Sequence, residues 1–180
     1  MTHRERLRRA GILCCHCLRN IAFYRSWNKA GRPFSKHQFL INLNGNFLDI
    51  AVLEWCKLFA DTRGKHHYCK VVAESAAFMT DALRSLNLTA AEFDAYVDSM
   101  KKYRDKFVAH LDELDTMKIP SLDIATKITE FLYQRLLAQE SRTDTFHDAP
   151  QSAAKFYKDF VAQGKQAYAS RLCCLTLRSS

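Results

Sequence analysis

Apolar residues recur at spacings of three, four and seven along most of the chain, which is the period of amphipathic helices. The alternation of apolar and polar residues that marks half-buried strands does not form a convincing run anywhere in the sequence. This pattern predicts an all-α protein. The expected helices span about 4–27, 36–61, 74–86, 90 into 103–112, 121–137 and 152–172, with a short segment at 66–73.

Local signals place several helix boundaries. Gly31-Arg32-Pro33 separates the first helix from the second. Ser35 is the expected N-cap of the second helix. Thr89 and Glu92 have the spacing of a capping box. Within the second helix, Gly45 predicts a close helix crossing. The stretch from Trp55 to Phe59 is expected in the core, and Glu54 and Lys57, three residues apart, are expected to pair on the helix surface.

The length of 180 residues and a hydrophobic content of 48% predict one folded domain over 1–180. A membrane-spanning helix needs roughly 20 mostly apolar residues, and the longest candidate, 10–18, is too short. This segment contains His16 and has no small-residue cleavage site, so we expect neither secretion nor a membrane partner. The expected location is the cytoplasm.

A formal net charge of +8 suits binding to nucleic acid or to an anionic surface. The basic residues include two clusters, and for either cluster alone a solvated helix surface is the simplest interpretation. The clusters are Arg4, Arg6, Arg8 and Arg9, and Lys101, Lys102, Arg104 and Lys106.

Seven cysteines occur, an odd number with adjacent members that pair poorly, so reduced thiols are expected. The run Cys14-Cys15-His16-Cys17 resembles metal-ligand material, and Cys173-Cys174 offers further ligands, but two well-spaced ligand pairs are lacking. Small, buried, inert cysteines are the preferred interpretation, and a metal-binding regulator is a weaker alternative. The adjacent His66 and His67 suggest packing or hydrogen bonding near a loop, so no metal or cofactor is predicted.

The segment 103–112, YRDKFVAHLD, combines an arginine with a histidine six residues later. Arg104 offers a planar fork of donors that fits phosphate oxygens. His110 can take and give a proton near neutral pH. Such a pair can cut an RNA backbone without a metal, although an arginine and a histidine at this spacing often occur by chance.

On an ideal helix, six residues rise ~9 Å and turn two side chains roughly 120° apart. One straight helix therefore does not direct Arg104 and His110 at the same phosphate. Either the helix ends between them, or the two groups converge from two subunits of a twofold dimer. Asp105 or Asp112 would then orient the guanidinium or the imidazole.

The segment YRDKFVAHLD resembles the arginine-to-histidine motif of HEPN domains, with Arg104, Asp105 and His110 at its three defining positions. The stretches 47–59 and 64–68 resemble the branch grouped with U-type abortive-infection proteins, so the likeness covers about 35–137. It implies a bundle of about four to five core helices, to which the basic helix 4–27 and the helix at about 152–172 are additions.

The resemblance also implies a function. Many HEPN domains are dimeric, metal-independent endoribonucleases of toxin or phage-defence systems, with RNA as substrate and an antitoxin or defence protein as partner. Others are non-catalytic modules that bind nucleotide, nucleic acid or protein. Arg104, His110 and Asp105 are the candidate catalytic residues, and Tyr103, Lys106 and Asp112 are candidates for supporting roles. Asp112 stands where some HEPN toxins carry a modifiable tyrosine, so that form of regulation is not expected.

Overall fold

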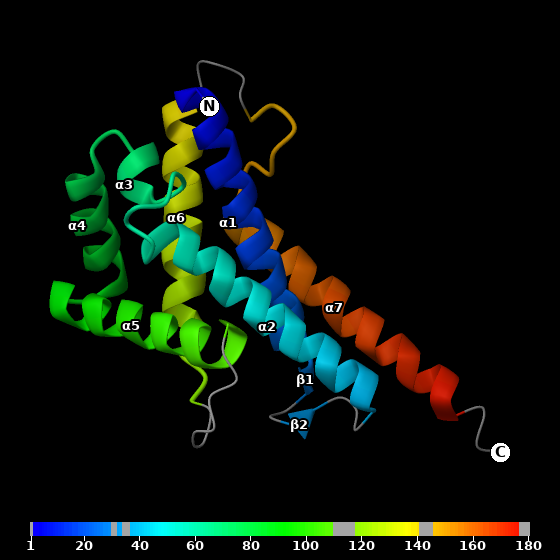
Figure 1. Ribbon diagram of the computed structural model, residues 1–180. Helices are drawn as coiled ribbons and strands as arrows, with labels where there is room; N and C mark the ends of the chain where they lie inside the picture. The colour runs from blue at the N-terminus through cyan, green and yellow to red at the C-terminus, as the bar shows by residue number, and fades with distance from the viewer. Residues whose placement is uncertain (1, 30–31, 34–36, 110–117, 141–145, 177–180) are drawn as a thin grey trace.

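The computed structural model describes residues 2–29, 32–33, 37–109, 118–140 and 146–176. Within these ranges the protein is a bundle of α-helices with one π-helical segment and a minimal strand pair, which confirms the all-α prediction (Figure 1). The elements are α1 (His3–Ser26), β1 (Asn28–Lys29), β2 (Arg32–Pro33), α2 (Gln38–Phe59), α3 (Tyr68–Val71), α4 (Ser75–Leu86), α5 (Ala90–Tyr103), the π-helix η1 (Arg104–Ala109), α6 (Leu122–Glu140) and α7 (Ala153–Thr176).

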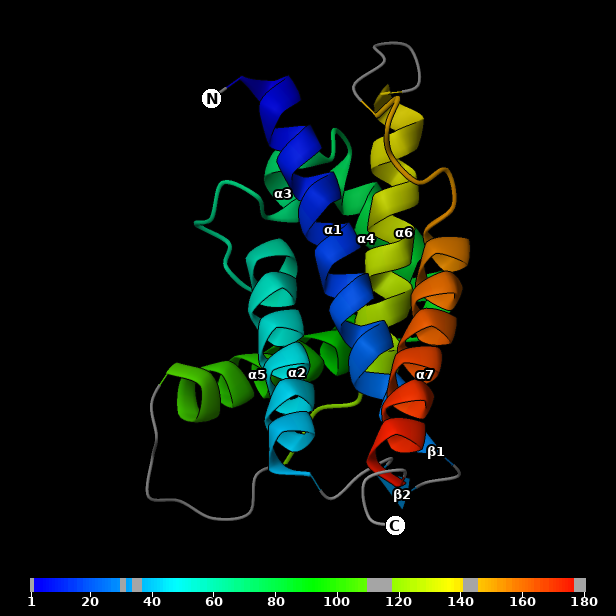
Figure 2. The ribbon, with the colours of Figure 1, turned by 90° about the vertical axis from the view of Figure 1, so that its right-hand side faces the viewer.

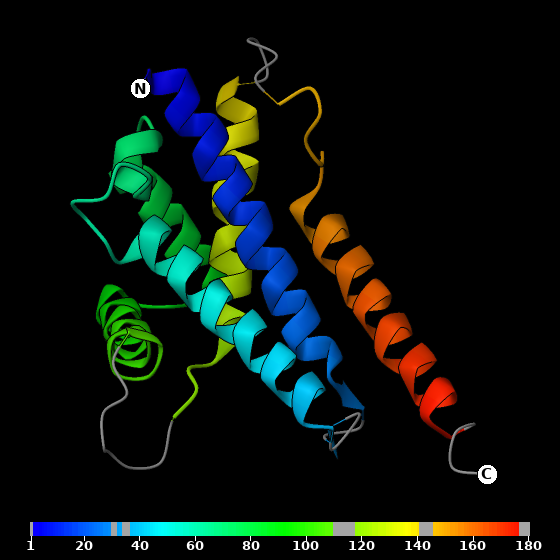
Figure 3. The same ribbon diagram turned by 45° about the vertical axis from the view of Figure 1, so that its right-hand side comes forward.

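α1 lies in the middle of the bundle. It starts in a capping box in which Glu5 N–H donates to the Thr2 hydroxyl (3.2 Å) and Thr2 N–H donates to the Glu5 carboxylate (2.8 Å). Its buried apolar residues follow the helical period: Leu7, Ala10, Cys14, Cys17, Leu18 and Ile21. α1 packs against α2, α6 and α7, and Figure 3 shows it between α2 and α7. The helix that the family resemblance leaves outside the 35–137 core is therefore central to the packing.

α2 supplies the aromatic centre of the core. Trp55 is fully buried, as predicted for 55–59, and its ring stacks on Phe59 with centroids 5.2 Å apart. Its edge meets Tyr96 of α5 at a centroid distance of 5.3 Å. Rings packed in these geometries add to the stabilisation from burial alone. Trp55 thereby fixes α5 across α2, in the arrangement that Figure 1 shows.

The junction between α4 and α5 follows its sequence signals. α4 ends at Asn87, which adopts the left-handed conformation (φ 54°) that caps helices. The predicted capping box is present, because Glu92 N–H donates to the Thr89 hydroxyl (3.2 Å) and Thr89 N–H donates to the Glu92 carboxylate (2.8 Å). α5 then runs without a break to Tyr103.

Close approaches to the helix backbone occur at glycines other than Gly45. A Cβ at Gly164 of α7 would stand 2.6 Å from the Ser26 hydroxyl oxygen, and one at Gly11 of α1 would stand 2.6 Å from the Phe146 ring. A Cβ at Gly45 would meet nothing within 4 Å. The predicted close crossing at Gly45 is therefore wrong, because no neighbouring atom comes near enough to need a glycine there.

Two further details of α2 differ from expectation. The helix begins at Gln38 with His37 at the N-cap position and no side-chain cap, while Ser35 lies outside the described residues. Glu54 is buried rather than paired with Lys57 on an exposed face, because it points towards α1. There the carboxylate lies 3.3 Å from His16 Nδ1, and burial raises the pKa of Glu54.

Candidate functional site

Arg104 stands where the backbone changes its hydrogen-bonding pattern. The α-helix α5 ends at Tyr103, and the π-helix η1 starts at Arg104 and runs to Ala109. π-Helical turns are rare and are found frequently at functional sites. The sequence predicts that the regular helix ends in or near the Arg–His segment. The α-helix does end there, and the change to a π-helix comes at Arg104 itself.

The Arg104 guanidinium is held by two carboxylates. Nε donates to Asp105 Oδ1 (2.7 Å) and Nη1 donates to Asp61 Oδ1 (2.6 Å). These are short, charge-assisted hydrogen bonds, and the bond to Asp105 is the largest cause of the raised pKa of Arg104. The side chain remains 20% exposed, so the two carboxylates orient a guanidinium that solvent reaches only in part.

Asp61 reaches Arg104 from a turn that follows α2. Gly64 N–H donates to the Asp61 carbonyl (2.7 Å), and Asp61 N–H donates to the Cys56 carbonyl (2.8 Å). His67 holds the other end of this turn, with Nε2 3.2 Å from the Phe59 carbonyl and Nδ1 accepting from Cys69 N–H (3.4 Å). His67 is buried, so the predicted packing and hydrogen-bonding role is confirmed.

Tyr103 and Cys56 form the buried side of this arrangement. The Tyr103 hydroxyl donates to Asp49 Oδ1 of α2 (2.9 Å), and burial together with this bond raises the pKa of Tyr103. Burial raises the pKa of Cys56 to about 12, although the nearby Arg104 acts in the opposite direction. Both groups are therefore neutral at physiological pH, and neither serves as a ready nucleophile or base.

The structure brings together some of the predicted site residues. Arg104 and Asp105 are in contact, Tyr103 precedes them as the last residue of α5, and Lys106 follows on η1. His110 and Asp112 lie outside the described residues. The pairing of Arg104 with His110 thus stays a prediction.

Sequence reasoning missed Asp61 and Asp49. Asp61 is 43 residues from Arg104 in the sequence, and Asp49 is 54 residues from Tyr103. Asp49 lies within 47–59, one of the stretches that carry the family resemblance. That stretch holds two acidic residues, Asp49 and Glu54, and of the two only Asp49 bonds to a described residue of the segment 103–112. For Asp61, its place directly after a long helix was the only local signal.

The described residues contain no group of three or more His, Cys, Asp or Glu side chains suited to a metal ion. Cys14, Cys17 and Cys56 are buried, and burial raises the pKa of each thiol. Cys15 is half-buried, and Cys69 on α3 is exposed. The side chains of Cys173 and Cys174 lie outside the described part of the chain.

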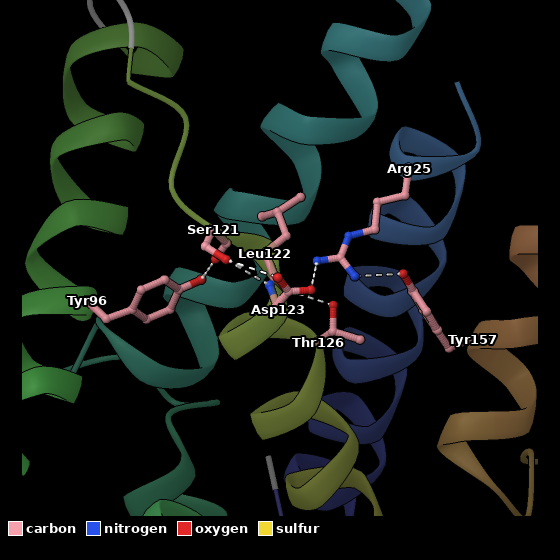
Figure 4. Close-up of polar contacts among 7 residues, drawn as sticks. All are labelled: Arg25, Tyr96, Ser121, Leu122, Asp123, Thr126 and Tyr157. Atoms are coloured by element: carbon pink, nitrogen blue, oxygen red, sulfur yellow. Dashed lines mark hydrogen bonds and ion pairs between the residues drawn. The ribbon is translucent and has the colours of Figure 1, made fainter. Parts of the chain in front are cut away.

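A second arginine cluster joins α1, α5, α6 and α7 (Figure 4). Arg25 of α1 donates from Nη2 to Asp123 Oδ1 (2.6 Å) and from Nη1 to the Tyr157 hydroxyl (3.1 Å). Beside the start of α6, the Tyr96 hydroxyl donates to the Ser121 carbonyl (2.6 Å). The bonds of Arg25 and Tyr96 run between different elements, which is the pattern of a structural clamp.

Comparison with protein-family models, with curated proteins and with solved structures gave no match. Among the described residues, no helix has the length and apolar character needed to cross a bilayer.

Proposed function

We propose that the protein is a metal-independent endoribonuclease of a toxin or phage-defence type that acts as a homodimer, with Arg104 and His110 as its central catalytic residues. The observation that carries this proposal is the position of Arg104. It begins η1 inside the HEPN-like motif, and two carboxylates fix the direction of its fork. The all-helical fold is compatible with the resemblance.

The proposed reaction is transesterification. Neutral His110 takes the proton from a ribose 2′-hydroxyl, and the 2′-oxygen attacks the adjacent phosphorus. Arg104 stabilises the charge that grows on the phosphoryl oxygens. A second histidine, His110 of the other subunit, protonates the leaving 5′-oxygen as the P–O5′ bond breaks. The products are a 2′,3′-cyclic phosphate and a 5′-hydroxyl.

The two carboxylates have a defined role in this proposal. Asp105 and Asp61 bond to Nε and Nη1, so the phosphate would meet the remaining edge of the Arg104 guanidinium. One cation beside two carboxylates carries a local net charge of −1. Attraction of RNA therefore has to come from other cations, of which Lys102 and Lys106 lie on the same helical segment.

The same contacts favour a second candidate, a non-catalytic HEPN-like module that binds nucleotide, nucleic acid or a protein partner. An arginine whose Nε and Nη1 are both bound by carboxylates also fits a purely structural role that joins η1 to the turn after α2. Under this alternative, Arg104 supports a binding surface without contacting a phosphate.

Cleavage of a mixed RNA pool in EDTA distinguishes the two candidates. The wild type, Arg104→Ala, His110→Ala and Arg25→Ala are compared, the last being a matched arginine that is also ion-paired at 2.6 Å but belongs to the other cluster. We expect losses of ~10² to 10⁴ in rate for His110→Ala, a comparable loss for Arg104→Ala, and none for Arg25→Ala. An inactive wild type, or a His110→Ala variant that cleaves like the wild type, rejects the nuclease.

A further inference from the structure

The outer face of α2 carries a stripe of four apolar residues and one asparagine that the described part of the chain leaves exposed or only half-buried. Its members recur at alternating spacings of four and three, which keeps them on one side of a helix. This outer stripe consists of Phe39, Leu43, Asn46, Ile50 and Leu53. Phe39 is 66% exposed and Ile50 is 42% exposed, while Leu43 and Leu53 are half-buried. Figure 2 shows α2 with α1 to one side of it and α5 behind it.

The opposite face of the same helix is already used. Leu48, Val52 and Trp55 point into the core and are at most 2% exposed. At about 100° per residue, this buried face and the outer stripe lie on opposite sides of α2. A helix that is apolar on both faces is normally covered on both.

The outer stripe is also free of charge. From Phe39 to Cys56 the only charged residues are Asp49 and Glu54, and these bond to Tyr103 and His16 within the chain. In a chain with 26% charged residues, an uncharged helix face of this length is unusual. Within the stripe itself a phosphate backbone or a charged peptide finds no complementary charge. The nearest cation on this side of α2 is the exposed Lys57, one turn beyond Leu53.

The pattern of the outer stripe matches a second copy of itself. Asn46 is its centre, seven residues from both Phe39 and Leu53, and two apolar residues stand on each side. Across a twofold axis at Asn46, apolar side chains face apolar side chains whichever way the second helix runs. The Asn46 amide has both donors and an acceptor, so it can pair with its own counterpart on the axis.

We propose that a second copy of the chain packs against the outer stripe of α2, with Asn46 at the twofold axis. This inference goes beyond the proposed function, and it stands on evidence that does not involve RNA cleavage. From Phe39 to Leu53 the stripe spans 14 helical steps, a length of about 21 Å. Such a strip, one helix wide, is well below the ~800 Å² per partner of a standard interface. The expected dimer is therefore weak and dissociates on dilution.

Sedimentation velocity over a wide range of protein concentration tests the surface. Ile50→Lys puts a charge into the outer stripe, and Ile41→Lys is its matched control, since Ile41 is 43% exposed on the same helix but off the stripe. We expect the wild type to dimerise, Ile50→Lys to raise the dissociation constant at least ~10-fold, and Ile41→Lys to leave it unchanged. Circular dichroism confirms that both variants fold. A wild type that stays monomeric at every concentration, or equal weakening by both variants, overturns the proposal.

Disulfide trapping tests the axis. Under mild oxidation, Asn46→Cys should give a linked dimer on a non-reducing gel, well above the background of the wild type, in which Cys69 is already exposed. Ile41→Cys serves as the off-stripe control. Linkage no greater than in this control rules out Asn46 at the axis. Because neither test measures RNA cleavage, a trapped dimer that does not cleave RNA counts against the nuclease and leaves the interface standing.

Discussion

Arg25 and Arg104 each join separate elements of this protein, and they do so in different ways. Arg25 binds Asp123 at 2.6 Å and Arg104 binds Asp61 at 2.6 Å, so the main ion pairs have the same length. The second partner differs, because Arg25 bonds to the Tyr157 hydroxyl whereas Arg104 bonds to a second carboxylate, Asp105. A close ion pair alone thus does not separate a candidate site from a structural clamp.

The backbone supplies the distinction. Arg25 lies in the last turn of the continuous α-helix α1. Arg104 lies at the point where α5 gives way to η1. Since π-helical segments are rare and frequently functional, the Arg104 cluster is the better candidate for chemistry, and the Arg25 cluster is the better candidate for support.

The largest expected effect concerns the shape of the cation. Arg104→Lys keeps the charge but removes the planar fork that the two carboxylates and a phosphate would share. We expect RNA cleavage in EDTA to fall by roughly 10²-fold, the range seen when one donor to a transition-state charge is removed. Arg25→Lys is the matched control and should retain full activity. If the two lysine variants cleave equally well, the distinction between the two arginine clusters has no catalytic meaning.

The helices followed from the sequence because their signals are local. The capping box at Thr89, the stop at Asn87 and the apolar period of α1 each depend on residues within a few positions of one another. The core role of Trp55 followed for the same reason, since its helix has a clear apolar side. The prediction at Gly45 failed because a glycine in a helix does not by itself show where a neighbouring element comes close.

The candidate site was only half predictable. Arg104 and Asp105 stood in one motif, and the structure joins them. Asp61 is 43 residues away, and its approach depends on how α2 ends and how the following turn closes. Such a contact is set by tertiary packing, which no local pattern in one sequence encodes. The change to a π-helix at Arg104 likewise has no propensity signal.

Acid should loosen the Arg104 side of the molecule before the Arg25 side. Burial lowers the pKa of His67, so its folded form binds fewer protons than its unfolded form. Its stabilisation is therefore present above the unfolded value of ~6.5 and is lost as the pH falls below it, at up to ~1.4 kcal/mol per pH unit. A proton on Nδ1 also breaks the bond from Cys69 N–H, which frees the turn that carries Asp61.

Hydrogen exchange between pH 7 and pH 5 measures this effect. After correction for intrinsic rates, the Gly64 amide, bonded to the Asp61 carbonyl at 2.7 Å, should lose protection well before the amides around Arg25. His67→Gln, which has no titrating group, should show a flatter dependence. A residual slope from His66 is expected, because burial lowers its pKa as well. Equal loss of protection at both arginine clusters contradicts the proposed order.

The smallest expected effect is a difference between the two ion pairs in their contribution to the free energy of unfolding. Arg104 and Asp61 are 20% and 41% exposed, whereas Arg25 and Asp123 are 31% and 72% exposed. Asp61→Asn should therefore lower the free energy of unfolding by about 1 kcal/mol, and Asp123→Asn by at most ~0.5 kcal/mol, as is typical of exposed pairs. Urea denaturation followed by circular dichroism measures both values. A double-mutant cycle with Arg104→Ala isolates the interaction of the pair from other roles of Asp61. A coupling energy near zero in this cycle would mean that the short Arg104–Asp61 contact orients the guanidinium without stabilising the fold.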